Sequence, residues 1–124
     1  MESLVIQKTE DTPSIDFNIE TRLFKLYGRS LPENAIDFYK PILDWLESVL
    51  SSTSNQNFII EIKLEYFNTA SSKQLAKLLL LVEKFVETNN ILIRWFYEKD
   101  DNDMLISGNQ YSKFLKLDFE FIEY

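Results

Sequence analysis

The chain has 124 residues, 45% of them hydrophobic and 15% aromatic, so it is large and apolar enough to fold as one domain spanning residues 1–124. Its formal charge of −7 argues against nucleic acid and anionic membranes as partners, and is compatible with a protein partner that has a basic face. Histidine and cysteine are absent and glycine occurs only twice, which argues against the serine-protease type of triad, thiolate metal sites and glycine-rich phosphate loops.

The N-terminal third predicts strands. Residues 4–6 could form a brief edge strand, and residues 15–19 alternate apolar and polar side chains as a half-buried strand does. Residues 22–27 predict a second strand, ended by Gly28. Because the intervening turn is short, we expect an antiparallel hairpin.

A helix follows over residues 32–51, because apolar residues recur there every three or four positions. Ser30 and Glu33 have the spacing of a capping box, and Pro32 is tolerated in a first helical turn. Pro41 lies inside the pattern, so we expect one helix with a kink.

The centre of the chain is a strand that runs directly into a helix. Residues 58–66 alternate apolar and polar side chains, and residues 71–87 carry an apolar helical stripe that includes Leu79. Between them lie small and polar residues that suit a helix start, and Ser71 and Gln74 have capping-box spacing.

Residues 91–97 are apolar on both faces apart from Arg94, which predicts an interior strand. Strand, helix and strand in succession predict a right-handed parallel βαβ unit. A lone arginine in such a strand is expected to pair with a carboxylate inside the protein rather than to bind phosphate.

The charged loop 98–103 lacks the spacing and glycine of a calcium loop, so it is interpreted as a solvated turn. Asn102 or Asp103 is the expected cap of a short helix over 103–115, and residues 117–121 alternate as a last strand.

The element order β-β-β-α-β-α-β-α-β predicts an α/β domain with a mixed sheet and helices mainly on one face. The sequence also carries no signal segment and no apolar run of about 18 residues, so we expect a soluble, cytoplasmic protein. The acidic pair Glu61 and Glu65 lies on a strand face expected to be solvated, with no oxyanion donors, and we therefore expect no enzyme, no cofactor and no metal site.

Two interpretations fit Thr69. On spacing alone, Asn68 or Thr69 simply caps the helix, since short side-chain oxygens commonly do so. Alternatively Thr69 is a phosphorylation site, where the helix dipole and free amides would accommodate the phosphate.

The hydroxyl cluster at this turn is similar to the serine-phosphorylated region of STAS domains, the anti-sigma-factor antagonists, although Asn68 stands where aspartate is usual. A closer resemblance is to the SiaC family of bacterial phosphoproteins. It rests on LEYFNTASSKQL (64–75), GRSLPEN (28–34) and IRWFYEKDDND (93–103), which occur in that family's order and spacing.

The resemblance implies a STAS-like regulatory domain without catalysis. A kinase would phosphorylate Thr69, a PPM-type phosphatase would remove the phosphate, and the unphosphorylated form would bind and activate a diguanylate cyclase, controlling cyclic-di-GMP and biofilm formation. An anti-sigma-factor antagonist that works by partner switching is the alternative, and a purely structural role also stays open. The expected partner-binding residues are Asn68, Thr69, Ala70, Ser71, Ser72, Pro32, Glu33 and Asn34.

Overall fold

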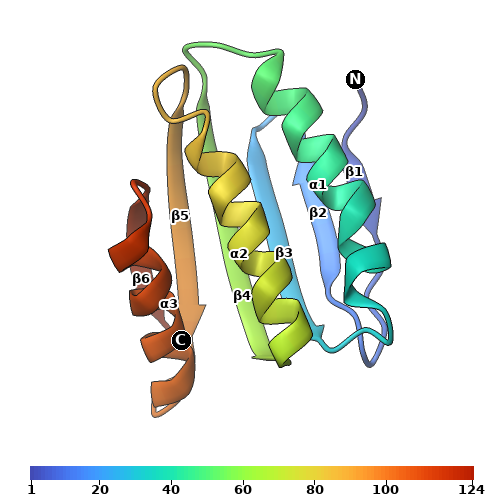
Figure 1. Ribbon diagram of the computed structural model, residues 1–124, viewed down its shortest axis with the longest axis vertical. Helices are drawn as coiled ribbons and strands as arrows, with labels where there is room; N and C mark the ends of the chain where they lie inside the picture. Colours follow the sequence, from blue (N-terminus) through green and yellow to red (C-terminus); the bar gives the residue numbers. More distant parts are fainter.

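A computed structural model describes all 124 residues as a six-stranded mixed β-sheet with three α-helices (Figure 1). The elements in chain order are β1 (Leu4–Ile6), β2 (Ser14–Asn18), β3 (Leu23–Ser30), α1 (Ala35–Ser51), β4 (Asn57–Phe67), α2 (Thr69–Glu83), β5 (Asn90–Tyr97), α3 (Asn102–Phe114) and β6 (Asp118–Glu123). This is the predicted order, including the short first strand.

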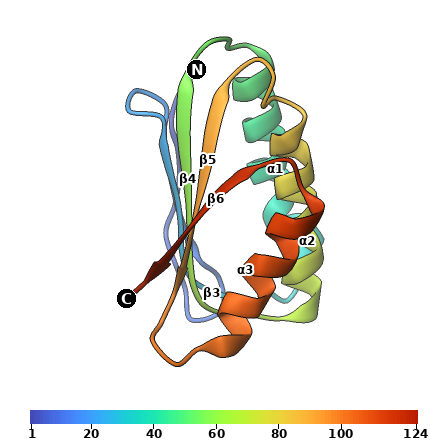
Figure 2. The same ribbon diagram turned by 90° about the vertical axis from the view of Figure 1, so that its left-hand side faces the viewer.

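The strands lie in the sheet in the order in which they occur in the chain. β1, β2 and β3 pair antiparallel, which confirms the expected hairpin, and β3, β4, β5 and β6 pair parallel. A helix joins each parallel pair of strands, and β5 is interior to the sheet, as predicted. All three helices cover one face of the sheet (Figure 2), which confirms the predicted layering.

The core fills the space between the sheet and α1 and α2. Alternate strand residues supply one side of it, for example Phe24, Ile60 and Trp95, which are fully buried. The apolar stripes of the helices supply the other side, including Leu79 as expected. None of the three helices combines the length and the apolar character that a membrane span requires.

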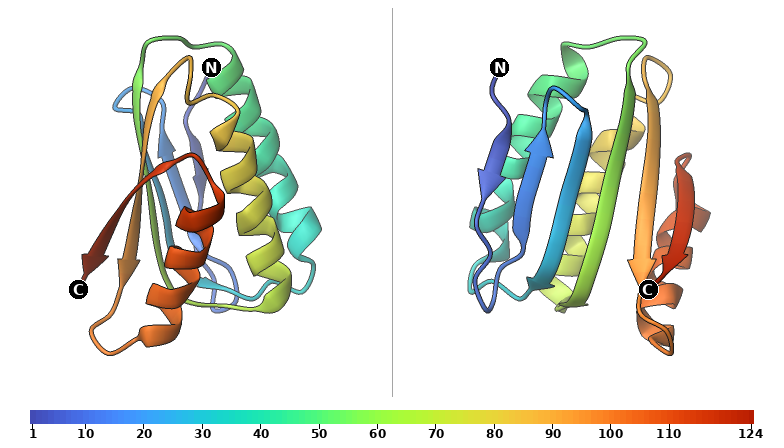
Figure 3. Two further views of the ribbon diagram at one scale, coloured as in Figure 1. Left: turned by 60° about the vertical axis from the view of Figure 1, so that its left-hand side comes forward. Right: turned by 180° about the vertical axis from the view of Figure 1, so that it is seen from behind.

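The opposite face of the sheet carries no helix (Figure 3, right). Here Arg94 lies between Glu61, at 3.2 Å, and Glu120, at 3.0 Å, so the predicted structural pairing is confirmed. Tyr27 donates a hydrogen bond of 2.5 Å to Glu61, and burial, together with this bond, raises the pKa of Tyr27. Glu61 is buried by these contacts, so the expectation that it is solvated was wrong.

The start of the first helix differs from the prediction. β3 continues past Gly28 to Ser30, with an irregular register between Gly28 and Arg29, so Gly28 does not end the strand. α1 then begins at Ala35, and its cap is Asn34, whose side chain accepts a hydrogen bond from the Asp37 amide. The expected capping box was therefore wrong, because Ser30 is held in the sheet.

Other boundaries differ as well, most of them by one or two residues. α2 begins at Thr69 and ends at Glu83, and the apolar pattern misplaced its end because Phe85 and Val86 still pack on the core from the turns that follow. α3 is capped by Asp101 rather than by Asn102 or Asp103. Pro41 lies inside α1, and the kink expected there stays a prediction.

Candidate functional site

The Thr69 turn lies at the carboxyl edge of the parallel strands, the lower edge of the sheet in Figure 1. β4 ends at Phe67, Asn68 makes the connection alone, and α2 begins at Thr69. The neighbouring strand β3 ends at Ser30, beside the turn. The Asn68 backbone amide donates a 3.0 Å hydrogen bond to the Ser30 carbonyl. Ligands and partners of open α/β sheets commonly bind at this edge.

Asn68 caps α2. Its side-chain oxygen accepts a hydrogen bond of 2.9 Å from the Ser71 amide, and its carbonyl accepts one of 2.9 Å from the Ser72 amide. The Ser71–Gln74 capping box is therefore not used. Thr69 occupies the first helical position, exposed to solvent, and its hydroxyl takes part in none of the hydrogen bonds at the turn. Because Asn68 already caps the helix, the Thr69 hydroxyl is free for another role.

A buried chain of hydrogen-bonded hydroxyl groups lies on the core side of the turn. The Ser30 hydroxyl donates to the Ser71 hydroxyl at 2.8 Å and lies 2.7 Å from the hydroxyl of Tyr39 in α1. All three side chains are fully buried, and burial raises the pKa of Tyr39 to about 12, only partly offset by its bond to Ser30. The chain ties β3, α1 and α2 together beside the Thr69 turn.

An open hollow of about 480 Å³ separates the first turns of α2 from α3. Thr69, Ser72 and Lys73 line one wall, and Gln110 and Tyr111 of α3 line the other. The Tyr111 hydroxyl bridges the two helices by donating a 2.9 Å hydrogen bond to the Ser72 carbonyl. Burial raises the pKa of Tyr111 to about 12.

The structure divides the expected partner-binding residues by exposure. Thr69 and Ala70 are exposed on the first turn of α2, Ser72 and Asn68 are half-buried, and Ser71 is fully buried. A buried side chain such as Ser71 supports the turn rather than meeting a partner directly.

The second expected segment lies on the β3–α1 connection at the same edge of the sheet. Pro32 is buried, whereas Glu33 and Asn34 are exposed, and Asn34 is engaged as the cap of α1. These three residues do not line the hollow beside Thr69.

Sequence reasoning missed the contributions of Tyr39 and of α3. Tyr39 and Tyr111 lie within the helices expected over residues 32–51 and 103–115, but periodicity does not show which polar atom a buried tyrosine reaches. The available signal was the residue type itself, since a buried phenol normally finds a hydrogen-bond partner.

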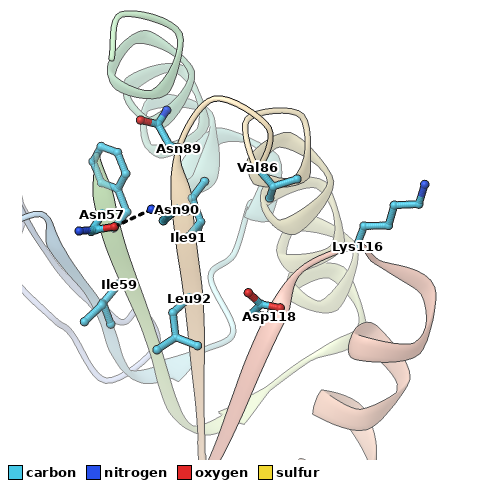
Figure 4. Close-up of a pocket in the computed structure, with 10 residues that line it drawn as sticks. Asn57, Ile59, Val86, Asn89, Asn90, Ile91, Leu92, Lys116 and Asp118 are labelled. Atoms are coloured by element: carbon cyan, nitrogen blue, oxygen red, sulfur yellow. Dashed lines mark hydrogen bonds between the residues drawn. The ribbon is translucent and has the colours of Figure 1, made fainter. Parts of the chain in front are cut away.

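A second hollow, of about 250 Å³, lies at the amino ends of β4 and β5 (Figure 4). Its polar side chains bond within the protein. The Asn90 side-chain amide donates to the Asn57 side-chain oxygen at 2.9 Å. The Asn89 side-chain oxygen accepts from the Gln56 backbone amide, and its side-chain amide donates to the carbonyls of Leu50 and Thr53. It offers no paired acids, and nowhere in the chain do three or more potential metal ligands cluster. The Thr69 turn is therefore the better candidate site.

Comparison with known proteins points to one family. Residues 6–124 match the family model described as SiaC family regulatory phosphoprotein. A protein of Pseudomonas aeruginosa strain UCBPP-PA14, described as uncharacterized, is 28% identical over 100 residues, which are 80% of this chain and 79% of that protein.

Solved structures show the same fold. The crystal structure of apo-SiaC from P. aeruginosa has a TM-score of 0.88 and 24% identity, covering 98% of this chain and 99% of that one. A crystal structure of the diguanylate cyclase SiaD in complex with its activator SiaC, also from P. aeruginosa, contains a chain with a TM-score of 0.90 and 23% identity, again covering 98% and 99%.

Proposed function

The chain belongs to the SiaC family of regulatory phosphoproteins, and from this premise we propose that it is a non-catalytic, phosphorylation-controlled activator of a diguanylate cyclase. In this proposal the unphosphorylated form binds and activates the cyclase. A serine/threonine kinase phosphorylates Thr69, which releases the cyclase, and a PPM-type phosphatase restores the binding form. The output is the level of cyclic-di-GMP and, through it, biofilm formation.

The observation that carries the proposal is the exposed Thr69 hydroxyl at the first position of α2, beside a cap that Asn68 already provides. A kinase needs an accessible hydroxyl, and modifying this one costs the helix no cap. The first amides of α2 and the positive end of its dipole would favour a phosphate there.

The switch acts through charge and hydration at the surface. Phosphorylation adds about 1.5–2 negative charges at neutral pH, and a dianion is costly to desolvate in an interface. The same phosphate leaves the fold intact, because Asn68, Ser71 and Tyr39 hold the turn without using the Thr69 hydroxyl. We expect a large change in affinity with little change in structure.

The test combines phosphate mapping with binding. The purified protein is treated with the kinase from the same organism, the modified residue is located by mass spectrometry, and both forms are titrated against the cyclase from that organism. We expect phosphate on Thr69, activation of the cyclase by the unmodified form, and affinity at least about tenfold lower for the phosphorylated form. Ser51→Ala, which removes an exposed hydroxyl from the end of α1 at the opposite edge of the sheet, is the control and should be phosphorylated and bind as the native protein does.

Phosphate on Ser72 instead of Thr69, or equal affinities for the two forms, would contradict the proposal. Binding to an anti-sigma factor in place of a cyclase would instead select the partner-switching alternative, in which the same turn serves a different partner.

A further inference from the structure

The hollow between α2 and α3 contains polar side chains that make no bond within the protein. The two helices lie side by side on the covered face of the sheet, and both line the hollow (Figures 1 and 2). The Tyr111 hydroxyl is engaged with the Ser72 carbonyl. The side chains of Lys73, Ser107 and Gln110 take part in no hydrogen bond or ion pair. The hollow therefore offers an ammonium group, a hydroxyl group and an amide group as free donors.

The hollow carries a positive charge although the chain as a whole is acidic. Lys73 is the only charged side chain that lines it. Each of the two helices contains one acid: Glu83, at the far end of α2, accepts the Lys116 backbone amide, and Asp103 lies in the first turn of α3. Neither of them, and no acid of the loop 98–101, lines the hollow. An anion in the hollow would meet a cation and no carboxylate.

The geometry points to this hollow as an intramolecular receptor for a phosphoryl group carried by Thr69. Thr69 lines the hollow, and its own hydroxyl is not engaged at the turn. Lys73 follows four residues later, the spacing at which side chains of a helix are neighbours, so its ammonium group pairs with the phosphate. Ser107 and Gln110 donate hydrogen bonds to the phosphate from α3.

A phosphoryl group suits the hollow in size and in chemistry. The volume of about 480 Å³ has room for it together with part of its hydration shell, since a water molecule occupies about 30 Å³ in the liquid. The oxygens of a phosphate dianion only accept hydrogen bonds, and the three free side chains can all donate them. The donors on α3 distinguish this arrangement from the bare start of a helix, because they come from a segment distant in the sequence.

This inference rests on the proposed function, in which Thr69 is the phosphorylated residue, and it adds what holds the phosphate afterwards. Lys73 neutralises only part of a group that carries about 1.5–2 negative charges, so the site stays anionic, as the switch requires. The phosphate then has a defined place between two helices instead of being free in solvent. α3 thereby takes part in the phosphorylated state through Ser107 and Gln110.

The experiment introduces phosphothreonine at position 69 of the full chain during translation, so that no kinase is needed. Phosphorus NMR follows the last ionisation of the phosphate, and proton–nitrogen spectra follow the side-chain amide of Gln110, which is identified by its loss in Gln110→Ala. We expect this amide resonance to shift on phosphorylation and to follow the titration of the phosphate, because a hydrogen bond to the phosphate reports its charge.

The same titration measures how strongly the hollow favours the dianion. A neighbouring cation and hydrogen-bond donors stabilise the charged form, so removing them should lower the acid dissociation constant of the phosphate. We expect a decrease of about threefold in Lys73→Ala, and a decrease of about threefold in the double variant Ser107→Ala with Gln110→Ala. The replaced side chains are exposed or half-buried, so the variants should fold, which circular dichroism checks.

Matched controls come from the same two helices. Lys77→Ala removes an exposed lysine of α2 one turn beyond Lys73, and Asn109→Ala removes a polar side chain of α3 next to Gln110. Neither residue lines the hollow. Both variants should keep the dissociation constant and the Gln110 resonance of the native chain.

An unshifted Gln110 amide, or equal dissociation constants in the native chain and the double variant, would overturn the inference, because α3 would then not contact the phosphate. An equal change in Lys77→Ala and Lys73→Ala would overturn it as well, since the lysines would act at a distance and not in the hollow. The proposed function is tested separately. If the kinase modifies another residue, or the cyclase binds both forms equally, the proposed function fails even where the resonances shift.

Discussion

At the scale of single residues, Asn68 and Thr69 are neighbours with short polar side chains, both common at helix starts, but only Asn68 caps α2. The Asn68 side-chain oxygen accepts a hydrogen bond from the Ser71 amide, which would otherwise have no helical partner. The Thr69 hydroxyl accepts no such hydrogen bond. Stability and regulation are thereby assigned to two residues, and a change at one need not compromise the other.

This separation predicts opposite results for two alanine variants. Asn68→Ala should lower the free energy of unfolding by about 0.5–2 kcal/mol, as the loss of an N-cap does. Thr69→Ala should change it by less than about 0.5 kcal/mol, because the side chain is exposed and makes no cap, and it should bind the cyclase in the presence of the kinase. Urea denaturation measures both, and equal losses would mean that the two residues share the capping.

Tyr39 predicts a pH dependence of stability at high pH. Its pKa is raised by burial from 10.0 to about 12, so the folded state holds a proton that the unfolded state has already lost between these values. Stability from this group is therefore complete below about pH 10 and is lost as the pH rises towards 12, by on the order of 2–3 kcal/mol.

Urea titrations of the native protein and of Tyr39→Phe at pH 8 and about pH 11 test this expectation. The variant should be less stable at pH 8, by about 0.5–1.5 kcal/mol for the hydrogen bond to Ser30, and should lose less stability than the native protein on going to high pH. Parallel curves for the two proteins would show that the titration of Tyr39 is not linked to unfolding. The pKa of Tyr111 is also raised to about 12, so Tyr111 lowers the stability at high pH equally in the native protein and in the variant.

At the scale of elements, α3 is positioned by one close approach. A Cβ atom added at Gly108 would lie 2.5 Å from Cδ1 and 2.6 Å from Nε1 of Trp95, which is fully buried and cannot move away. Gly108 is thus needed for space rather than for backbone freedom, and it sets how near α3 comes to β5.

Gly108→Ala should therefore be destabilising, by about 1–3 kcal/mol, even though alanine is the better helix former by about 1 kcal/mol. The displaced helix carries Gln110 and Tyr111, which line the hollow beside Thr69, so the variant should also weaken partner binding. Gln110→Ala, on the same helix but exposed, should retain native stability. The denaturation midpoints of the two variants test this expectation. An increase in stability for Gly108→Ala would show that α3 does not pack closely against Trp95 at Gly108.

The elements themselves were largely predictable from sequence, because period-two and helical patterns report which face of a segment is buried. The errors have local physical causes. Ser30 resembled a cap because its spacing from Glu33 is right, yet its pairing with β4 holds it in the sheet. The α2 stripe extended to Val86 because apolar residues can reach the core from a turn as well as from a helix.

At the scale of the whole molecule, the candidate site was only half predictable. The Thr69 turn is local in sequence and was found from its residue types and from its family resemblance. The buried Ser30–Tyr39–Ser71 chain and the hollow between α2 and α3 join segments that are far apart in the sequence, and no periodicity indicates their contact.

The arrangement also separates the effect of phosphorylation on the fold from its effect on binding. A phosphate on Thr69 lies at the positive end of the α2 dipole and at the i, i+4 spacing from Lys73, both of which favour it. The Thr69 hydroxyl is not a hydrogen-bond partner of the Ser30–Tyr39–Ser71 chain. Phosphorylation should therefore leave stability unchanged or raise it by about 0.3–1 kcal/mol, while it weakens cyclase binding.

Thermal denaturation and hydrogen exchange of the two forms, measured side by side with the binding titration, test this prediction. Amide protection should be unchanged in β3, β4 and β5, and should rise only in the first turn of α2. Thr69→Ala treated with the same kinase is the control and should show neither change. If phosphorylation instead lowered the melting temperature and exposed the amides of α2 and α3, the switch would operate by local unfolding. A rise in protection together with a fall in affinity is the pattern that a charge acting at the surface of a folded domain must give.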